Sequence, residues 1–313
     1  LTMSVPDKNG QFDDVILGYD SVDGIQTQPG HPGEPVGRNA NRIGGAKFTL
    51  NGVTYELAKN SAEVNNLHSG PDYYRDRIWD AEVEETALGT TITFGLHSPD
   101  GDQGYPGNAD ITVSYTLTPD NCLKLDYHMV SDADTIANFT NHVYFNLGGY
   151  KSGSALDQKV WIDADYFTAT DANSIPTGEL VAVKGTPMDF TEMKPIGRDI
   201  QEDYQALKYG NGYDHNWALN HPAGELSLSA KAEDEKTGRT MEVYTDLPGV
   251  QFYTANSLKT EHGKNHAVYT PRCGYCFETQ YFPDAINKPE FASPVIKAGE
   301  EYKTTTIYKF GVK

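Results

Sequence analysis

Apolar and polar residues alternate with a period of two along most of this chain, whereas helical periodicity is nearly absent. Successive side chains of a strand point to opposite faces, so this alternation predicts half-buried β-strands. In the clearest hairpin, a Thr-Pro-Asp-Asn turn at residues 118–121 joins two alternating runs. Its apolar positions are Ile111, Val113, Tyr115, Leu117, Leu123, Leu125, Tyr127 and Met129. Many such segments with loops between them predict antiparallel sheets that stack on one another.

Two further hairpins are expected, one at residues 47–57 with Asn51 and Gly52 at its tip, and one in which residues 226–232 pair with 241–245. The best helix candidate, residues 198–207, is short. The chain has 30 Gly and 17 Pro residues, which suits many turns, and its 313 residues fit one large β core. We find no repeat of fixed period and no linker. We therefore predict an all-β fold, a large antiparallel β-sandwich with few short helices, in which residues 1–313 form a single domain.

The chain carries 25 basic and 44 acidic side chains, which gives a net charge of -19. Such a surface repels nucleic acid and anionic lipid, whose binding relies on clustered Lys and Arg, so neither is expected as a partner. The same balance weighs against a phosphorylated substrate. No run of about 18 apolar residues is present, and no membrane span is expected.

Cysteine is sparse, with Cys122, Cys273 and Cys276 as the three examples. Three thiols cannot form a full disulfide framework, so a reducing compartment, the cytoplasm, is the simpler expectation. No basic segment followed by an apolar core opens the sequence, and no signal peptide is expected. Cys273 and Cys276 have the spacing of a redox or zinc motif, but they lie in a strand-like run without a second pair. We assign them neither role.

The stretch richest in chemistry is residues 138–149, which centres on His142. Strand formers surround this imidazole, and a double glycine ends the run. Alternation predicts that one face of the strand presents His142, Tyr144 and Asn146, and the other Val143, Phe145 and Leu147. The polar face suits a hydroxyl-rich ligand, and the imidazole can exchange a proton near neutral pH. The alternative is a partly buried histidine with local hydrogen bonds.

Polar groups also gather in two segments nearer the N-terminus. Residues 38–42 hold two arginines and two asparagines, among them Asn41 and Arg42, whose forked donors and amides match sugar hydroxyls or a carboxylate. A surface turn with salt bridges is the alternative. His68 lies in a loop before a Gly-Pro turn, where a histidine is more often solvated than catalytic.

Three more candidates lie in the C-terminal half. Alternation places Asp214 on one strand face and His215 on the other, so one face presents a carboxylate. Gln251 lies in a strand-like context. Glu278 is mid-strand among aromatic residues, where partial burial would raise its pKa from about 4.3 and make it a better base. The alternative for Glu278 is an edge-strand glutamate that faces water.

Taken together, these motifs resemble the aldose 1-epimerase (galactose mutarotase) family. The resemblance runs from about residue 14 to the C-terminus and rests on six motifs in the same order. The motif residues are Gly37, Arg38, Asn41, Arg42 and Ile43; Asn66, Leu67 and His68; residues 141–147; Asp214, His215 and Asn216; residues 249–254; and Glu278, Thr279 and Gln280 followed by residues 282–287.

The resemblance implies a galactose mutarotase-like sandwich with a sugar site in a groove across one sheet. It implies an isomerase that interconverts the α and β anomers of aldohexoses such as D-galactose and D-glucose, without a metal or an organic cofactor. By the same resemblance, Glu278 is the general base at the C1 hydroxyl, His142 is the general acid at the ring oxygen, and His68 aligns the ring oxygen. The residues implied to hold the sugar are Asn41, Arg42, His68, Tyr144, Asp214 and Gln251. We expect a monomer or a homodimer.

Two expectations accompany this assignment. Ring opening removes a proton at one oxygen and delivers one at another, so His142 should prefer its charged form, with help from Glu278. The sequence departs from the family at residues 30–36, Gly-His-Pro-Gly-Glu-Pro-Val, where an aromatic-glycine entry is usual, and at Ser69, which replaces a glycine. These departures bear on the preferred sugar more than on the reaction.

Three other functions are compatible with parts of the pattern. A hexose-6-phosphate mutarotase would need an arginine-rich phosphate pocket. A non-catalytic carbohydrate-binding β-sandwich would keep Arg42 and Asp214 but would not need Glu278 with His142. A glycoside hydrolase could use Glu278 and Asp214 as its two carboxylates, across a groove open at both ends.

Overall fold

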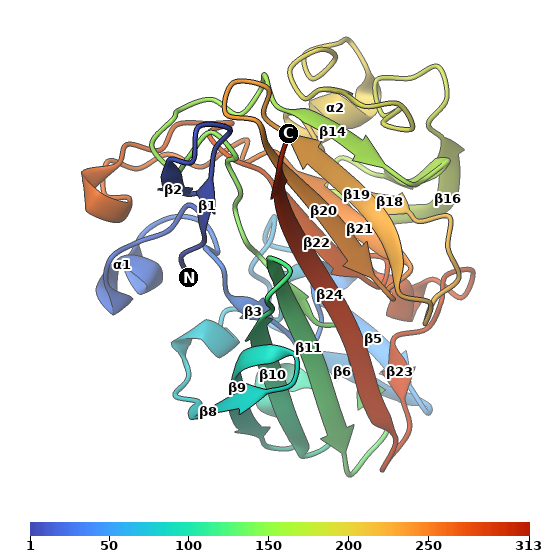
Figure 1. Cartoon of the computed structure of the whole chain (residues 1–313). Helices are drawn as coiled ribbons and strands as arrows, with labels where there is room; N and C mark the ends of the chain where they lie inside the picture. Colours follow the sequence, from blue (N-terminus) through green and yellow to red (C-terminus); the bar gives the residue numbers. More distant parts are fainter.

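Two antiparallel sheets contain most of the strand residues in the computed structural model of Figure 1, which describes all 313 residues. The larger sheet has nine strands, with β24 in its middle beside β20 and β11. In spatial order they are β17 (Lys194–Pro195), β14 (Lys159–Ile162), β19 (Ser227–Glu233), β20 (Arg239–Thr245), β24 (Glu301–Val312), β11 (Cys122–Ser131), β10 (Ala109–Leu117), β9 (Gly89–Ser98) and β8 (Asp80–Thr86).

The smaller sheet has five strands and positions the polar residues of interest. In spatial order they are β16 (Pro176–Ala182), β15 (Tyr166–Thr170), β18 (Asp214–Ala218), β21 (Gly249–Tyr253) and β22 (Cys276–Gln280). Two-stranded ribbons complete the β structure: β1 (Ser4–Pro6) with β2 (Phe12–Asp14), β3 (Pro35–Val36) with β13 (Thr140–Asn141), β4 (Arg42–Ile43) with β7 (Asn66–Leu67), β5 (Lys47–Leu50) with β6 (Val53–Glu56), and β12 (Thr135–Ile136) with β23 (Val295–Ile296).

All three predicted hairpins are confirmed. Strands β10 and β11 pair from Leu117 opposite Leu123 onward, β5 pairs with β6 across the Asn51-Gly52 tip, and β19 pairs with β20. On β11 and β20, buried residues alternate with partly exposed ones, as the period-two pattern requires. The alternating sequence therefore determines both the pairing and the face that each strand buries.

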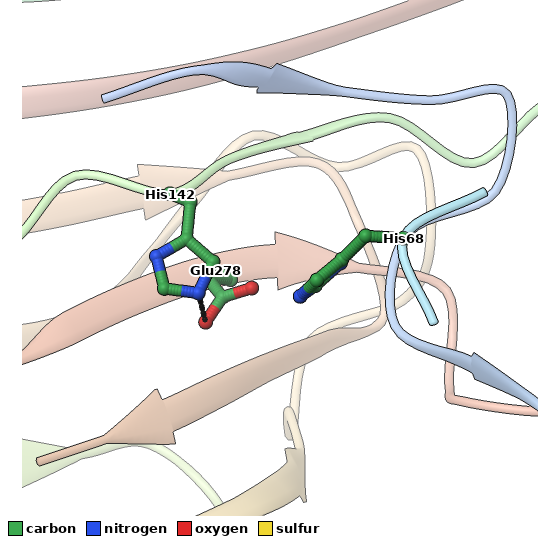
Figure 2. A group of neighbouring side chains, drawn as sticks. All are labelled: His68, His142 and Glu278. Atoms are coloured by element: carbon green, nitrogen blue, oxygen red, sulfur yellow. Dashed lines mark ion pairs between the residues drawn. The ribbon is translucent and has the colours of Figure 1, made fainter. Parts of the chain in front are cut away.

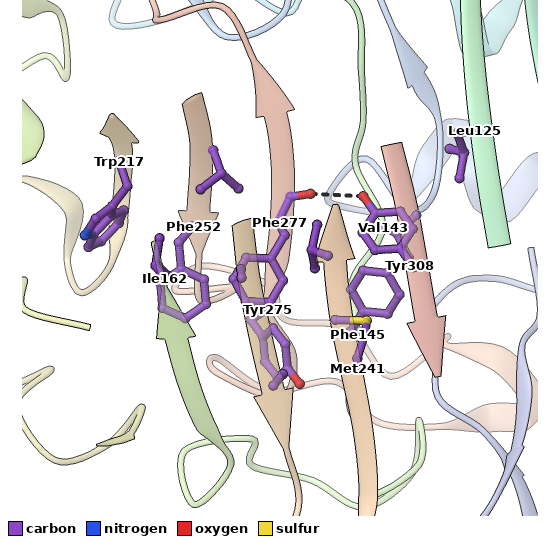
Figure 3. Close-up of a cluster of buried hydrophobic side chains, with 14 of the residues drawn as sticks. Leu125, Val143, Phe145, Ile162, Trp217, Met241, Phe252, Tyr275, Phe277 and Tyr308 are labelled. Carbon is purple, nitrogen blue, oxygen red and sulfur yellow. Dashed lines mark hydrogen bonds between the residues drawn. The ribbon is translucent and has the colours of Figure 1, made fainter. Parts of the chain in front are cut away.

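The core lies between the two sheets and confirms the β-sandwich (Figure 3). One cluster of 42 buried residues draws on both sheets. From the smaller sheet Trp217, Phe252 and Phe277 pack inward, and from the larger sheet Met241 and Tyr308 face them. The Tyr308 hydroxyl donates to the Phe277 carbonyl at 3.0 Å, so a strand of each sheet is tied to the other. This packing fixes the backbone of β22, which carries Glu278.

Helical structure is limited to α1 (Val22–Thr27), α2 (Gln205–Gly210) and five single 3₁₀ turns. The predicted helix at residues 198–207 is wrong over most of its length, and α1 was not expected. Around Asp199 the chain turns because its carboxylate accepts from buried Lys194 at 2.7 Å and from Arg198 at 3.0 Å. No helix in the structure is long and apolar enough to cross a membrane.

The stretch at residues 138–149 differs from a regular strand. Only β13 at its start is a strand, and Phe145 then forms isolated bridges with Ile16 and Tyr275. The predicted apolar side is confirmed, because Val143, Phe145 and Leu147 are buried in the main core. The segment is extended but irregular because its hydrogen bonds go to several distant segments instead of one neighbouring strand.

Candidate active site

A cavity of about 280 Å³ lies where β18, β21 and β22 meet the loops around β3, β4 and β13. Most of its lining side chains are polar, and three of them are histidines. The lining residues are Pro29, Gly30, His31, Asn41, Arg42, Leu67, His68, His142, Tyr144, Asp214, Tyr253, Ser257, Leu258 and Glu278. Segments separated by up to 249 positions in the sequence therefore converge on one site.

A larger hollow of about 1040 Å³ lies around Asp189, Arg198 and Glu202. Its central charges neutralise one another, since Asp199 pairs with Arg198 and Lys194. None of its lining residues has a buried polar side-chain atom without a hydrogen-bond partner. The smaller cavity is the stronger candidate, because convergent polar groups with perturbed pKa values mark functional sites.

Glu278 reaches the cavity because of its position on β22. Phe277 turns into the core, and Thr279 hydrogen bonds to Thr306 of the larger sheet at 2.6 Å. Glu278, between them, projects from the opposite face with a side chain only 2% exposed. Its Oε2 is buried without a hydrogen-bond partner in the protein. A buried acceptor without a partner is costly, so this oxygen is suited to receive a ligand's hydroxyl. The alternative of a glutamate that faces water is wrong.

His142 lies against this carboxylate. Its Nε2 is 3.4 Å from Glu278 Oε1, and the imidazole side chain is 6% exposed. Figure 2 shows the pair, with His68 directed toward it from the opposite side. The His142 backbone is fixed at both polar atoms, because its N–H donates to the Glu34 carbonyl and its carbonyl accepts from Gly33 N–H. An imidazole and a carboxyl group thus face one cavity within reach of a shared ligand.

Burial shifts the pKa values of this pair in opposite directions. It lowers the pKa of His142 well below its ordinary value. It raises the pKa of Glu278 well above its ordinary value, and the negative charge of Asp214 adds to that rise. Both shifts favour the uncharged form of each group. The expectation that His142 prefers its charged form is therefore wrong for the protein alone, because desolvation has the largest effect on its pKa.

His68 is held in one tautomer. Its Nδ1 accepts the backbone N–H of Asn41 at 3.1 Å, so the neutral ring carries its proton on Nε2. Burial lowers the pKa of His68 well below its ordinary value, which keeps the ring neutral. Both residues have left-handed backbones, with φ of 60° at Asn41 and 53° at His68, a strained arrangement that recurs at functional sites. His68 therefore offers the cavity an N–H donor.

Asp214 and Arg42 supply opposite charges to the cavity wall. Asp214 projects from β18, as alternation predicts, while His215 packs against Trp217 on the other face. Asp214 Oδ1 accepts from Gln251 at 2.8 Å, and Gln251 lies behind Asp214 instead of lining the cavity. Arg42 Nε is buried without a hydrogen-bond partner in the protein, so this group, like Glu278 Oε2, is available to a ligand.

Tyr144 and Asn146 have different surroundings from each other. Tyr144 lines the cavity with its ring centroid 4.9 Å from that of His142, and burial raises its phenol pKa well above the ordinary value. Asn146 is fully buried elsewhere, where its amide donates to the carbonyls of Gly153 and Cys273 and accepts from Gln158. The expected polar face thus holds for His142 and Tyr144 but not for Asn146, which organises the backbone.

The sequence did not point to two residues that lie near Glu278 and His142. Cys276 Sγ lies 3.5 Å from His142 Nδ1, and a signal for it existed, because Cys276 and Glu278 are two positions apart on one strand face. His31 lies in the departing segment 30–36 and brings a third imidazole to the cavity. No local pattern indicated its position. All three cysteines are unpaired thiols.

The ligand atoms of His68, His142 and Glu278 lie within 4.8 Å of one another, a spacing that raises the question of a metal. A metal at His68 Nε2 would require the proton of that ring to move to Nδ1. There it would face the Asn41 N–H, which already points at Nδ1. The tautomer set by the backbone therefore makes this trio a poor donor set for a metal.

Comparisons with known proteins agree with this geometry. The family model described as aldose 1-epimerase matches residues 1–309. The galactose mutarotase of Bos taurus is 41% identical over 312 residues, which cover 99% of this chain and 87% of that protein. The aldose 1-epimerase of Escherichia coli strain K12 is 34% identical over 312 residues, with 99% and 88% covered. A crystal structure of an aldose epimerase homologue from C. elegans superposes with a TM-score of 0.89 at 27% identity, covering 99% of this chain and 92% of that one.

Proposed function

This chain belongs to the aldose 1-epimerase family and is an isomerase that interconverts the α and β anomers of aldoses; we propose that Glu278 and His142 carry its proton transfers. The observation that carries the proposal is the buried pair, 3.4 Å apart and facing one cavity. Such a pair can hold one proton in two ways, as carboxylate with imidazolium or as carboxylic acid with neutral imidazole. The two forms have the same net charge and differ in where one proton resides.

Ring opening converts the first form into the second. Glu278 takes the proton of the C1 hydroxyl while His142 gives its proton to the ring oxygen, and the C1–O5 bond breaks to leave an aldehyde. Rotation about C1–C2 then exposes the other carbonyl face. In closure, Glu278 returns a proton to the carbonyl oxygen while His142 takes the proton of the 5-hydroxyl as that oxygen attacks. No proton is consumed over the cycle, and each transfer contributes about 100- to 10,000-fold.

Burial also acts on the equilibrium between the two forms of the pair. The low pKa of His142 and the high pKa of Glu278 favour the uncharged form of the pair. That form accompanies the open-chain aldehyde, whereas the charged form accompanies the bound ring. Ring opening therefore starts from the less favoured form of the pair and proceeds toward the favoured one.

The other cavity groups suit binding. His68 would donate its Nε2–H to the ring oxygen, and Asn41 fixes that orientation. Arg42, Asp214 and Tyr144 would bind hydroxyls, with Gln251 holding the carboxylate of Asp214 in place. Gln251 therefore positions Asp214 in the sugar site and does not contact the sugar itself.

We propose an aldohexose such as D-galactose or D-glucose as the substrate, in line with the names of the relatives. A phosphorylated hexose fits less well, because Arg42 is the one arginine among the lining residues. A binding module without catalysis would have no use for a buried carboxyl group with an unsatisfied oxygen beside an imidazole.

Polarimetry of freshly dissolved sugars tests this function. We expect catalytic amounts of the protein to accelerate the approach of α-D-galactose and α-D-glucose to anomeric equilibrium, with no change in the final rotation. Rates that match the buffer control would overturn the proposal. Rapid equilibration of a hexose 6-phosphate but not of the free hexoses would indicate the phosphate function instead.

A further inference from the structure

The loop before β3 places a third imidazole, that of His31, in the sugar cavity. Its ring centroid lies 5.1 Å from that of His68 and 5.4 Å from that of His142. The loop approaches closely at Gly30, which has φ of +89° and whose Cβ, if present, would lie 3.1 Å from the Tyr144 hydroxyl. A side chain at position 30 would therefore push the loop away from the cavity. The proposed mechanism gives His31 no role.

A buried carboxylate orients this imidazole. Glu34 is only 5% exposed, and its Oε1 lies 2.6 Å from His31 Nδ1. The Glu34 Oε2 accepts from Arg75 Nη1 at 3.0 Å, and Arg75 also donates to the Gly30 carbonyl. The Glu34 oxygen is nearer to Nδ1 than Arg75 Nη1 is, at 2.6 Å against 3.3 Å, and a carboxylate accepts, so the proton on the His31 ring lies on Nδ1. The neutral ring then presents a lone pair on Nε2, on the opposite edge of a ring that lines the cavity.

The backbone of this loop does not depend on that carboxylate. Its hydrogen bonds to the His142 segment, from Gly33 N–H and to the Glu34 carbonyl, are made by the main chain. A buried group of charges is weak evidence for stability, because desolvation opposes the attraction between its members. The side chains of Glu34 and Arg75 are thus better explained by the orientation that they give to His31.

We propose that His31 determines sugar specificity by accepting a hydrogen bond from the 6-hydroxyl of a hexose. This inference rests on the proposed function. In that function His68 and His142 meet the ring oxygen, and Glu278 occupies the C1 side of it. The other neighbour of the ring oxygen is C5, which carries the CH2OH group of a hexose. His31 stands beside both histidines, and its acceptor Nε2 complements a hydroxyl donor, whereas His68 offers a donor.

The test compares D-galactose with D-fucose, its 6-deoxy analogue, in wild type and in His31→Phe. We expect wild type to favour D-galactose in kcat/KM by about tenfold or more, because a site that hydrogen bonds a hydroxyl rejects the analogue without it. In His31→Phe the kcat/KM values for the two sugars should agree within about twofold, and the value for D-fucose should be close to that of wild type. His31→Gln, which restores an acceptor, should regain part of the preference.

His97→Phe is the matched control, because His97 forms the same kind of histidine–carboxylate pair, with Asp110 at 2.7 Å, on the exposed strand β9. This control should leave the ratio of kcat/KM for D-galactose to kcat/KM for D-fucose unchanged. A wild-type ratio near one, a ratio that persists in His31→Phe, or equal losses for both sugars would overturn the inference. If His31→Phe does not fold, His31→Ala takes its place, and a wild-type ratio in that variant would overturn the inference as well. A wild type inactive on both sugars would instead contradict the proposed function.

Discussion

Replacing Glu278 with Gln is expected to lower kcat/KM for mutarotation of D-galactose by about 100- to 10,000-fold, with the protein still folded. The amide is close to the carboxylic acid in size but cannot take the C1 proton. Binding should be affected less than kcat, because Arg42, Asp214 and His68 remain in the cavity. Saturation kinetics by polarimetry or by NMR exchange between the anomers would measure both constants.

The residual rate of Glu278→Gln should also depend on pH with a definite sign. The low pKa of His142 comes chiefly from burial, not from Glu278, so it persists in this variant. The imidazolium needed to protonate the ring oxygen then forms only in acid, and the residual rate should rise as pH falls. Glu301→Gln, which changes an exposed glutamate paired with Lys303, is the control and should behave like wild type. A variant of Glu278 with more than a tenth of wild-type kcat would contradict the assignment of the base.

His142→Asn is expected to produce a loss of similar size with the opposite pH dependence. Without the imidazole, ring opening relies on Glu278 alone and on water as the acid. The high pKa of Glu278 comes from burial and from Asp214, so it also persists, and the carboxylate that acts as base increases as pH rises. The residual rate should therefore rise toward alkaline pH, measured by polarimetry across the range in which the variant stays folded.

The control for this prediction is His97→Asn, an exposed histidine outside the cavity. Circular dichroism of His142→Asn checks that the segment after β13 has kept its backbone, which is held by main-chain hydrogen bonds to Gly33 and Glu34. Residual rates that fall toward alkaline pH in this variant would mean that Glu278 does not act as the base.

The fold was largely predictable because its strands are amphipathic and its turns are local. The β10–β11 hairpin follows from alternation and a four-residue turn, and both are visible within about twenty residues. The segment around His142 was less predictable, because Phe145 pairs with Ile16 and Tyr275, which are distant in the sequence. The helix expected at residues 198–207 failed for a local reason, since the Asp199 carboxylate is held by the buried amine of Lys194, five positions earlier.

The site was predictable where a residue's role depends on its strand face. Asp214 and Glu278 project as alternation requires, and the family resemblance named them together with His142. The preferred protonation states were not predictable, because they depend on burial by segments that the sequence does not bring together. The position of His31 was likewise not predictable, since it depends on a loop that folds back onto His142 and Tyr144.

The double variant Glu278→Gln with His142→Asn tests most directly whether one proton passes between this pair and the sugar. If the two groups act as a unit, each single change already removes their cooperation, and the double variant should lose clearly less kcat/KM than the product of the two single losses. Losses that multiply, so that the double variant falls by the product of the two single effects, would show that Glu278 and His142 act independently and would contradict the shared-proton account.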